Sequence, residues 1–189
     1  MNVLVIGGGV VGVTTAYYLS QKGLNVTVLE AQEKDVDFGA TAGNAALLAP
    51  SDAFAWASPS ALKLVTKSLL NSQLGIQYKL HMDPALWRWT ASFLSQCRSS
   101  KWVQNSDFKF RLAQYSIDML ADLRLITNIN FDVSDQGIAY ASRNPSDLKK
   151  LRSHFNFLED RGLKLELLDR DGLHEKLPLL QPNSETYAG

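Results

Sequence analysis

Three glycines and one acidic residue near the N-terminus have the types and spacing of a motif that binds phosphates and a sugar. Gly7, Gly9 and Gly12 form the pattern G-x-G-x-x-G, and Glu30 follows about 20 residues later. In such a motif the first glycine lets the chain turn tightly, the second gives a pyrophosphate room beside the backbone, and the third lets a helix lie close to a sheet. The acid accepts hydrogen bonds from ribose hydroxyls. The pattern therefore predicts a dinucleotide site.

The residues around these glycines predict the elements that such a site requires. Residues 3–6 are an apolar run typical of a strand, and a helical stretch then runs on to Gly23, a residue suited to the left-handed conformation that ends a helix. Residues 25–29 read as a second strand that ends at Glu30. The start of the helix would offer unpaired N–H groups and a positive dipole end to the phosphates. This context favours a nucleotide unit over an ordinary βαβ unit with a glycine-rich turn.

Two further features narrow the class of cofactor. The carboxylate of Glu30 would repel a 2′-phosphate, so NADP is disfavoured. An NAD-dependent enzyme with a single Rossmann domain remains an alternative, but it needs a third strand soon after Glu30, and residues 31–58 show neither strand nor helix periodicity. A stretch of this length is usually functional or disordered. The small residues at 39–46 would let the backbone lie against a flat ligand.

Composition excludes several other classes of function. The 189 residues are 46% apolar and 20% charged, which is typical of a globular protein with a core, and nineteen basic residues balance nineteen acidic ones, so nucleic acid is not an expected partner. Cys97 is the one cysteine, which rules out an internal disulfide or a cysteine-based zinc cluster, and we expect it to be a buried small side chain. His81, His154 and His174 lack metal-ligand spacing and are expected at the surface or a boundary, so no metal site is predicted.

The sequence contains no pattern typical of export or of a membrane span. No basic leader precedes the apolar stretch at residues 3–13, which is too short to cross a bilayer. We therefore expect a cytoplasmic protein, or one attached peripherally to the inner membrane. Trp87, Trp89 and Trp102 lie near Arg88, Arg98 and Lys101. They would form either an interfacial patch or part of the packing within the domain, and the second interpretation is favoured.

The rest of the chain predicts helices with identifiable start and stop signals. Ser58 followed by Pro59 opens a helix to about Leu70, and Asp83 opens another at residue 84. The second of these helices should bury the face carrying Leu86, Thr90, Phe93 and Cys97. A longer helix over 107–126 should bury Phe108, Leu112, Tyr115, Met119, Leu123 and Ile126, with Lys109, Arg111, Asp118 and Asp122 solvated.

The C-terminal third predicts a mixture of strands and helices. Residues 131–133 and 138–140 flank Asp135-Gln136-Gly137, which suggests a hairpin. A helix marked by Leu148, Leu151, Phe155 and Leu158 should stop at Gly162. Residues 163–167 alternate like a strand, and a short helix should run through Leu177 before Pro178.

The opening segment resembles a flavoprotein fingerprint. The residues that carry this likeness are Gly7, Gly9, Gly12, Ala16, Leu19, Gly23, Val26, Val28 and Glu30. A more specific likeness follows, because residues 40–46 (ATAGNAA) are similar to the segment T-S-x-A-N-x-G of one family, and its proline and small residues with tryptophan continue at Pro50, Ala53, Ala55, Trp56, Ala57 and Pro59. Residues 86–89 and 111–116 are also similar. On these residues the chain resembles the FAD-dependent D-amino-acid dehydrogenases of the small-subunit type, in the D-amino-acid oxidase and glycine oxidase superfamily.

The resemblance implies a fold and a set of cofactor contacts. The fold would be α/β: a Rossmann-like, GR2-type FAD-binding domain with part of an α+β substrate domain. Residues 1–58 would be the first part of the FAD-binding domain, and 59–189 a partial substrate or cap region with helices and the start of a mixed sheet. Asn44 would contact the flavin. Motif and resemblance together imply FAD contacts at Val3, Gly7, Gly9, Val10, Val11, Gly12, Glu30, Ala31, Thr41, Asn44 and Ala45.

The resemblance also implies a reaction in D-amino acid catabolism. A D-amino acid, usually D-alanine, is oxidised to an imino acid that hydrolyses to a 2-oxo acid and ammonia, and the electrons pass to a respiratory acceptor such as a quinone. The substrate carboxylate requires a cation, commonly arginine. Eight arginines are present and none is singled out by its context, so no catalytic residue is assigned: Arg88, Arg98, Arg111, Arg124, Arg143, Arg152, Arg161 and Arg170.

Two departures from the family pattern leave alternatives open. The family's glycine after the asparagine falls on Ala46, where a side chain would limit the approach of the backbone to the flavin. The likeness also covers only about the first half of a family member. The alternatives are therefore another FAD-dependent amine or amino-acid oxidase, or a truncated chain without activity of its own. We expect this chain alone to be poorly soluble and to retain FAD weakly, because a missing packing partner would cost stability comparable with the usual margin of ~5–15 kcal/mol.

Overall fold

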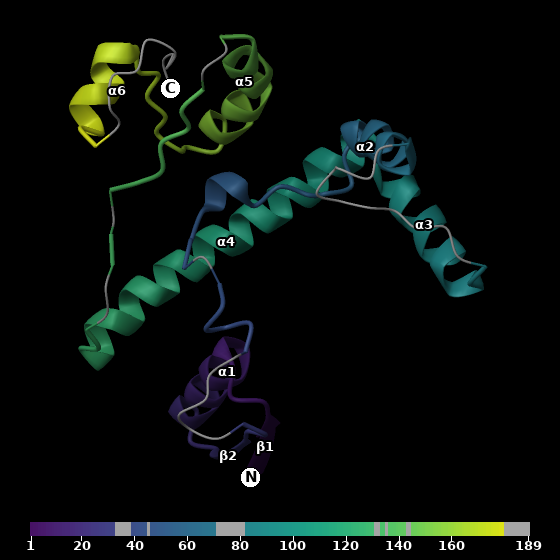
Figure 1. Ribbon diagram of the computed structural model, residues 1–189. Helices are drawn as coiled ribbons and strands as arrows, with labels where there is room; N and C mark the ends of the chain where they lie inside the picture. The colour runs from purple at the N-terminus through teal and green to yellow at the C-terminus, as the bar shows by residue number, and fades with distance from the viewer. Residues whose placement is uncertain are drawn as a thin grey trace. The chain divides into compact units, whose positions relative to one another are not determined.

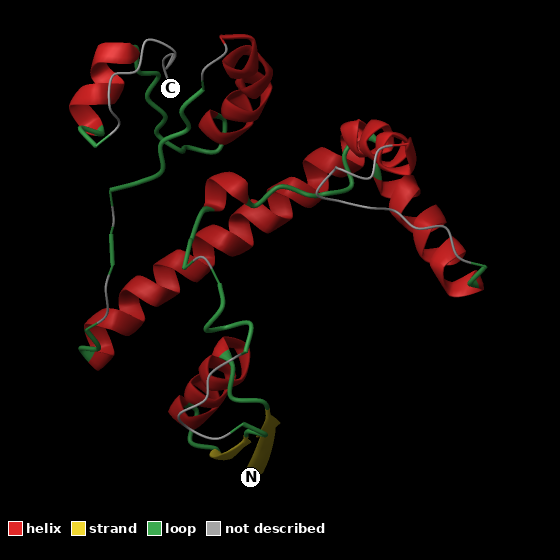
Figure 2. Cartoon of the chain, viewed as in Figure 1, coloured by secondary structure: helices red, strands yellow, loops and turns green. Residues whose placement is uncertain are grey.

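The computed structural model describes residues 1–32, 39–44, 46–70, 82–130, 133–134, 136–142 and 145–179 (Figure 1). The chain divides into two compact units, Met1–Leu48 and Ala49–Gly189, and each is described by itself. Among the described residues, the strands lie in the first unit, while the second contains helices and loops (Figure 2).

The first unit is built on a βαβ arrangement. Strand β1 (Asn2–Ile6) and strand β2 (Asn25–Leu29) pair in parallel, with Val3 opposite Val26 and Val5 opposite Val28. Helix α1 (Val10–Gln21) joins them, as a parallel pair requires a crossover connection. The predicted order of strand, glycine turn, helix and strand is confirmed. Strand β1 begins at Asn2, one residue before the predicted start. Helix α1 ends at Gln21, close to the predicted end at Gly23, which lies at φ +78° as a residue that ends a helix often does.

The second unit consists of helices whose starts follow local capping signals. A short 3-10 helix, η1 (Pro50–Asp52), precedes α2 (Pro59–Leu70), where the Ser58 hydroxyl accepts a hydrogen bond from the Ala61 N–H at 3.2 Å. Helix α3 (Pro84–Gln96) begins after Asp83, whose carboxylate accepts the N–H of Ala85 at 2.8 Å. Both predicted helix starts are therefore confirmed.

Three further helices complete the described part of the second unit. They are α4 (Ser99–Thr127), α5 (Pro145–Glu159) and α6 (Arg170–Lys176). Gly162 lies at φ +83° shortly after α5, which agrees with the predicted stop. Helix α6 ends at Lys176, one residue before the predicted Leu177, and its N-cap Asp169 accepts the N–H of Gly172 at 2.8 Å.

The core of the second unit gathers around Phe54. Phe110, Phe157 and Leu158 form a buried cluster, against which Phe54, Leu163 and Leu165 pack. The Phe54 ring lies 5.7 Å from the Trp102 ring and 5.1 Å from the Phe157 ring, measured between centroids. Aromatic pairs at these separations add to the burial energy of the rings. This cluster holds the segment after η1 against α4 and α5.

Hydrogen bonds from side chains of α4 to the backbone of residues 54–55 hold this segment along the helix. The Trp102 indole N–H donates to the Ala55 carbonyl at 3.1 Å, the Ser106 hydroxyl accepts from the Ala55 N–H at 3.0 Å, and the Lys109 ammonium donates to the Phe54 carbonyl at 2.8 Å. Residues 53–55 lie outside any helix or strand, so side chains of α4 supply partners for these backbone groups. Trp102 is therefore part of the packing, as the favoured interpretation held.

The predicted faces of the two longer helices have different outcomes. On α3 the prediction is confirmed, because Cys97 is buried and Leu86, Thr90 and Phe93 are half-buried. Burial also raises the pKa of the Cys97 thiol, which agrees with an inert side chain. On α4 the predicted face is wrong for Phe108, Leu112, Tyr115 and Ile126, which are exposed. The face with Trp102, Ser106 and Phe110 is covered instead, because it carries the partners of the 54–55 backbone.

The predicted strands of the C-terminal third do not form in the described residues. Residues 138–140 and 163–167 have no strand assignment. Leu163 and Leu165 instead pack against the aromatic core as separate side chains. Phe131, Asp132 and Asp135 of the predicted hairpin lie outside the described residues. The alternation of apolar and polar residues at 163–167 therefore indicates a half-buried segment and not a paired strand.

Candidate functional site

The loop between β1 and α1 depends on glycine at two positions for different reasons. Gly7 lies at φ +100°, a conformation that side chains rarely adopt, and its N–H donates to the Leu29 carbonyl at 2.7 Å. A Cβ on Gly12 would lie 1.9 Å from the carbonyl oxygen of Gly7, so only glycine lets α1 approach this closely. The predicted conformational roles of the first and third glycines are thus confirmed.

The N-terminus of α1 carries backbone donors beside this loop. Gly9 is the N-cap and offers no side-chain acceptor, and the first turn contains no acidic residue. The Thr41 hydroxyl accepts from the Val10 N–H at 3.0 Å. Helix geometry leaves the N–H groups of Val11 and Gly12 without an intrahelical acceptor. Together with the helix dipole, these two donors favour an anion at this end of α1.

The carboxylate of Glu30 is held by three backbone N–H groups. Its Oε2 accepts from Gly8 at 2.5 Å, and its Oε1 accepts from Ala31 at 2.7 Å and from Gln32 at 3.1 Å. These bonds, with the Gly8 bond as the largest cause, lower the pKa of Glu30 below its ordinary value of 4.5. The group is therefore ionised near neutral pH, and it is exposed and able to accept further hydrogen bonds.

The segment after residue 38 reaches the same loop through Thr41. Asn44 folds its amide back on this segment: Nδ2 donates to the Thr41 carbonyl, and Oδ1 accepts from the Ala46 N–H at 2.5 Å. Ala46 lies at φ +51°, a conformation that favours glycine. The family pattern places its glycine at this position. The backbone of this chain thus keeps the conformation although the residue is alanine.

The structure brings together most of the residues that the sequence predicts for a cofactor. Gly7, Gly9, Val10, Val11, Gly12, Glu30, Ala31 and Thr41 all lie at or next to the carboxyl ends of the two strands or the start of α1. Asn44 joins them through Thr41, whereas Val3 lies within β1, away from the loop. Ala45 lies outside the described residues. Cofactor contact at these positions stays a prediction.

Sequence reasoning missed Gly8, which lies between two glycines of the motif. Its N–H binds Glu30 directly, and a Cβ at this position would lie 2.9 Å from Glu30 Oε2. The signal available in the sequence was the run of three consecutive glycines at 7–9, one more than the motif needs.

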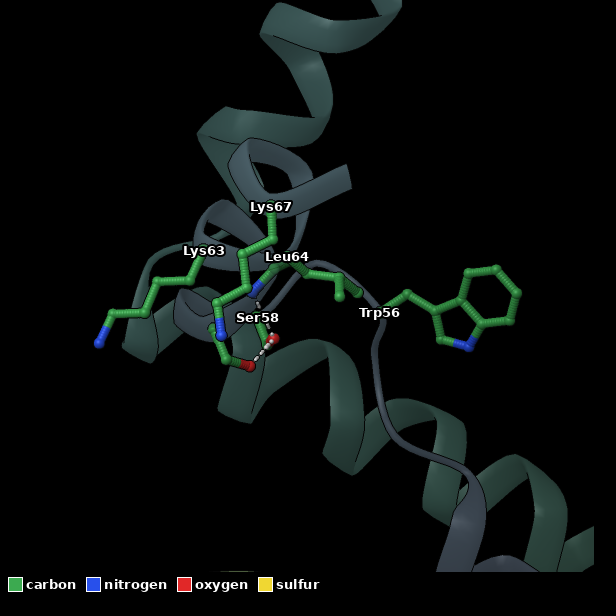
Figure 3. A pocket seen from close by; sticks show the side chains of 7 residues that line it. Trp56, Ser58, Lys63, Leu64 and Lys67 are labelled. Atoms are coloured by element: carbon green, nitrogen blue, oxygen red, sulfur yellow. Dashed lines mark hydrogen bonds between the residues drawn. The ribbon is translucent and has the colours of Figure 1, made fainter. Parts of the chain in front are cut away.

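A surface hollow on the second unit has a different character. Figure 3 shows Ser58, Lys63, Leu64 and Lys67 around the start of α2, with Trp56 directed away from the two lysines. The hydrogen bonds drawn there belong to the helix cap, since Ser58 Oγ lies 2.8 Å from Ser60 Oγ. None of the predicted cofactor residues lines this hollow. We assign it no role in binding.

A polar cluster at η1 is explained by its contacts. The Tyr140 hydroxyl donates to Asp52 at 2.7 Å and lies 3.3 Å from Ser51 Oγ, and His154 Nε2 lies 3.2 Å from the Ser51 carbonyl oxygen. Burial lowers the pKa of His154, whose ring lies 3.7 Å from that of Phe54, and burial raises the pKa of Tyr140. The cluster ties η1 to α5, and His154 sits at a boundary as predicted.

The described residues contain neither a cluster of metal ligands nor a membrane-spanning helix. No group of three His, Cys, Asp or Glu side chains in this part of the chain is arranged to hold a metal ion. Within the same residues, no helix combines the length and the apolar content needed to cross a membrane. His81 lies outside the described residues.

Comparison with known proteins adds a family to this geometry. A family model named DAO, described as FAD dependent oxidoreductase, matches residues 2–189. The chain is 39% identical over 189 residues to "D-amino acid dehydrogenase 2" of Mesorhizobium japonicum and 32% identical over 189 residues to "D-amino acid dehydrogenase" of Azorhizobium caulinodans. Each alignment covers 100% of this chain and 45% of the relative, so the chain spans less than half the length of these proteins. No solved structure matches the chain significantly.

Proposed function

This chain belongs to the DAO family of FAD-dependent oxidoreductases, and from that premise we propose that it forms the dinucleotide-binding part of a D-amino acid dehydrogenase. One observation carries the proposal. The N–H groups at the start of α1 and the ionised carboxylate of Glu30 lie beside the same glycine loop, since α1 begins at its end and Glu30 accepts the N–H of Gly8 within it. The pyrophosphate of an adenine dinucleotide needs hydrogen-bond donors, and the neighbouring ribose needs an acceptor.

The residues of the loop fit this group. Val11 and Gly12 would donate their N–H groups to the pyrophosphate, and Glu30 would accept from a ribose hydroxyl. Thr41 now accepts from Val10, and its hydroxyl can also donate to a phosphate oxygen at the same place. FAD, when bound, supplies the acceptor for the hydride. The task of this chain's residues is to bind the cofactor and orient it.

The assignment of domains and chemistry extends the same proposal. Residues 1–58 would begin a Rossmann-like FAD-binding domain, and 59–189 would belong to an α+β substrate or cap region. The names of the two relatives support a D-amino acid as substrate, with D-alanine as the first candidate. The products would be a 2-oxo acid and ammonia. We assign no catalytic residue, because the chain spans 45% of those relatives.

A respiratory electron acceptor such as a quinone would require contact with a membrane surface. Trp87 is 47% exposed and Trp89 is 57% exposed on α3, and exposed indole rings favour the water–lipid boundary. Flotation with anionic liposomes tests this contact. Replacing both residues with alanine should reduce binding, while Phe108→Ala, which removes another exposed aromatic side chain, should not. Equal binding by all three proteins would remove the membrane contact from the proposal.

The reaction itself is tested by dye reduction. A purified protein that carries this chain at the full length of its relatives is supplied with FAD and mixed with D-alanine or L-alanine and an artificial electron acceptor. We expect dye reduction and pyruvate with the D-isomer only, and little peroxide. Turnover with simple amines, or peroxide in place of dye reduction, would favour a different FAD-dependent oxidase. Reduction that depends on NAD rather than FAD would contradict the proposal.

A further inference from the structure

The backbone conformation of Gly8 does not require glycine, but the space beside it leaves little room for a side chain. Gly7 and Gly23 have positive φ angles and open space where a Cβ would be. Gly8 has no positive φ, yet a Cβ there would lie 2.9 Å from Glu30 Oε2 and 3.4 Å from Glu30 Cβ. A side chain at Gly8 would therefore collide with the carboxylate of Glu30 in its present position, whereas the turn itself requires no positive φ there.

The same contact limits how Glu30 can receive a ligand. A carboxylate offers about four lone-pair sites. Two on Oε1 face the N–H groups of Ala31 and Gln32, and one on Oε2 faces the N–H of Gly8. The acceptor site that is left lies on Oε2, beside Gly8. A ribose hydroxyl that binds Glu30 must approach there.

We propose that Gly8 is a positioning residue that sets the specificity of the site for an unphosphorylated ribose. Its N–H and its missing side chain hold Glu30 Oε2 in place, so one ribose hydroxyl finds a fixed acceptor and a 2′-phosphate meets a fixed negative charge. The inference rests on the proposed dinucleotide function. It goes beyond the three motif glycines, because Gly8 occupies a position at which the motif accepts any residue.

A substitution at Gly8 should move the carboxylate without unfolding the unit. The nearest atom to an added Cβ is the far end of a flexible side chain, which can rotate away. Gly8→Ala should therefore keep the βαβ unit but displace Glu30 Oε2 from the Gly8 N–H. Ser20→Ala is the control, because Ser20 is exposed on the last turn of α1, at the end away from the glycine loop, where its hydroxyl donates to the Tyr17 carbonyl at 2.7 Å.

The experiment combines a ligand-free and a ligand-bound measurement. In the first, the Glu30 carboxyl pKa is followed by carbon NMR in the protein without ligand. This pKa should lie below 4.5 in the wild type and in Ser20→Ala, and rise toward 4.5 in Gly8→Ala. In the second, calorimetry compares ADP-ribose with its 2′-phosphorylated form. The preference for ADP-ribose should shrink by about tenfold in Gly8→Ala, the change expected for about 1.4 kcal/mol.

The outcomes separate this inference from the proposed function. In a Glu30→Gln background, adding Gly8→Ala should leave the preference for ADP-ribose unchanged, because the carboxylate that Gly8 positions is gone. A wild type that binds FAD, together with a Gly8→Ala variant of unchanged pKa and unchanged preference, would overturn the role of Gly8 alone. A wild type that takes up neither FAD nor ADP-ribose would overturn the proposed function.

Discussion

Gly12→Ala tests how closely α1 must approach the glycine loop. The added Cβ would lie 1.9 Å from the Gly7 carbonyl oxygen and 3.0 Å from its carbon. Real Cβ atoms essentially never come closer than 3.0 Å to another heavy atom, so the helix must move away from the loop by about 1 Å. Because backbone lies on both sides of the clash, no rotamer change relieves it.

The expected change in the free energy of unfolding is the difference between two opposing effects. Overpacking costs about 1–3 kcal/mol, and a backbone clash belongs near the upper end of that range. Alanine in place of glycine returns at most ~1 kcal/mol of helix propensity. We therefore expect the free energy of unfolding to fall by about 2 kcal/mol. The displaced N–H groups should also weaken FAD binding by about tenfold or more.

Urea unfolding followed by circular dichroism measures the stability, and calorimetry measures FAD affinity. Ser20→Ala is the control and should change the free energy of unfolding by less than about 0.5 kcal/mol, as surface substitutions usually do. If Gly12→Ala is as stable as this control and binds FAD equally well, the site does not depend on the close contact between α1 and the loop, and the reasoning is refuted.

Three further predictions test separate features. The stabilising contribution of ionised Glu30 is present above its ordinary pKa of 4.5 and is lost as pH falls through its lowered folded pKa, so unfolding curves at a series of pH values should show a loss that Glu30→Gln abolishes. Ala46→Gly should stabilise the protein by about 0.5 kcal/mol because φ is +51°, whereas Ala49→Gly at φ −127° should destabilise it by about as much; denaturation midpoints that move together would refute this. Arg161→Lys should cost about 1–2 kcal/mol in thermal unfolding, because lysine cannot keep the 2.8 Å bond to Asp107 together with the cation–π contact; an unchanged midpoint would count against it.

Local signals predicted much of the fold. The positive-φ requirement at Gly7, the cap residues Ser58 and Asp83 and the stop at Gly162 each act within a few residues, so the sequence contains all the information needed. The geometry of the glycine loop beside Glu30 was predictable for the same reason. The spacing from Gly7 to Glu30 specifies a strand, a helix and a strand that bring the two together.

Features that depend on distant partners were not predictable in this way. The apolar stripe through Phe108 and Leu112 predicts a buried face on α4, but these side chains are exposed. The covered face is the one whose side chains hydrogen-bond the backbone of residues 54–55, and the spacing of apolar residues cannot reveal those partners. The alternating residues 163–167 gave the pattern of a strand without a pairing partner. Gly8 was missed because its reason for being glycine is a contact with a side chain 22 residues away.

The central claim is that an adenine dinucleotide binds at the start of α1 with its ribose on Glu30. Calorimetric titration with FAD of a protein that carries this chain at the full length of its relatives, compared among wild type, Glu30→Gln and Ser20→Ala, tests it most directly. We expect uptake by the wild type and by Ser20→Ala, and affinity about tenfold or more lower in Glu30→Gln, because the hydrogen bond from the ribose to a charged carboxylate is weakened. Absence of FAD uptake by the wild type, or equal affinity in all three proteins, would contradict it.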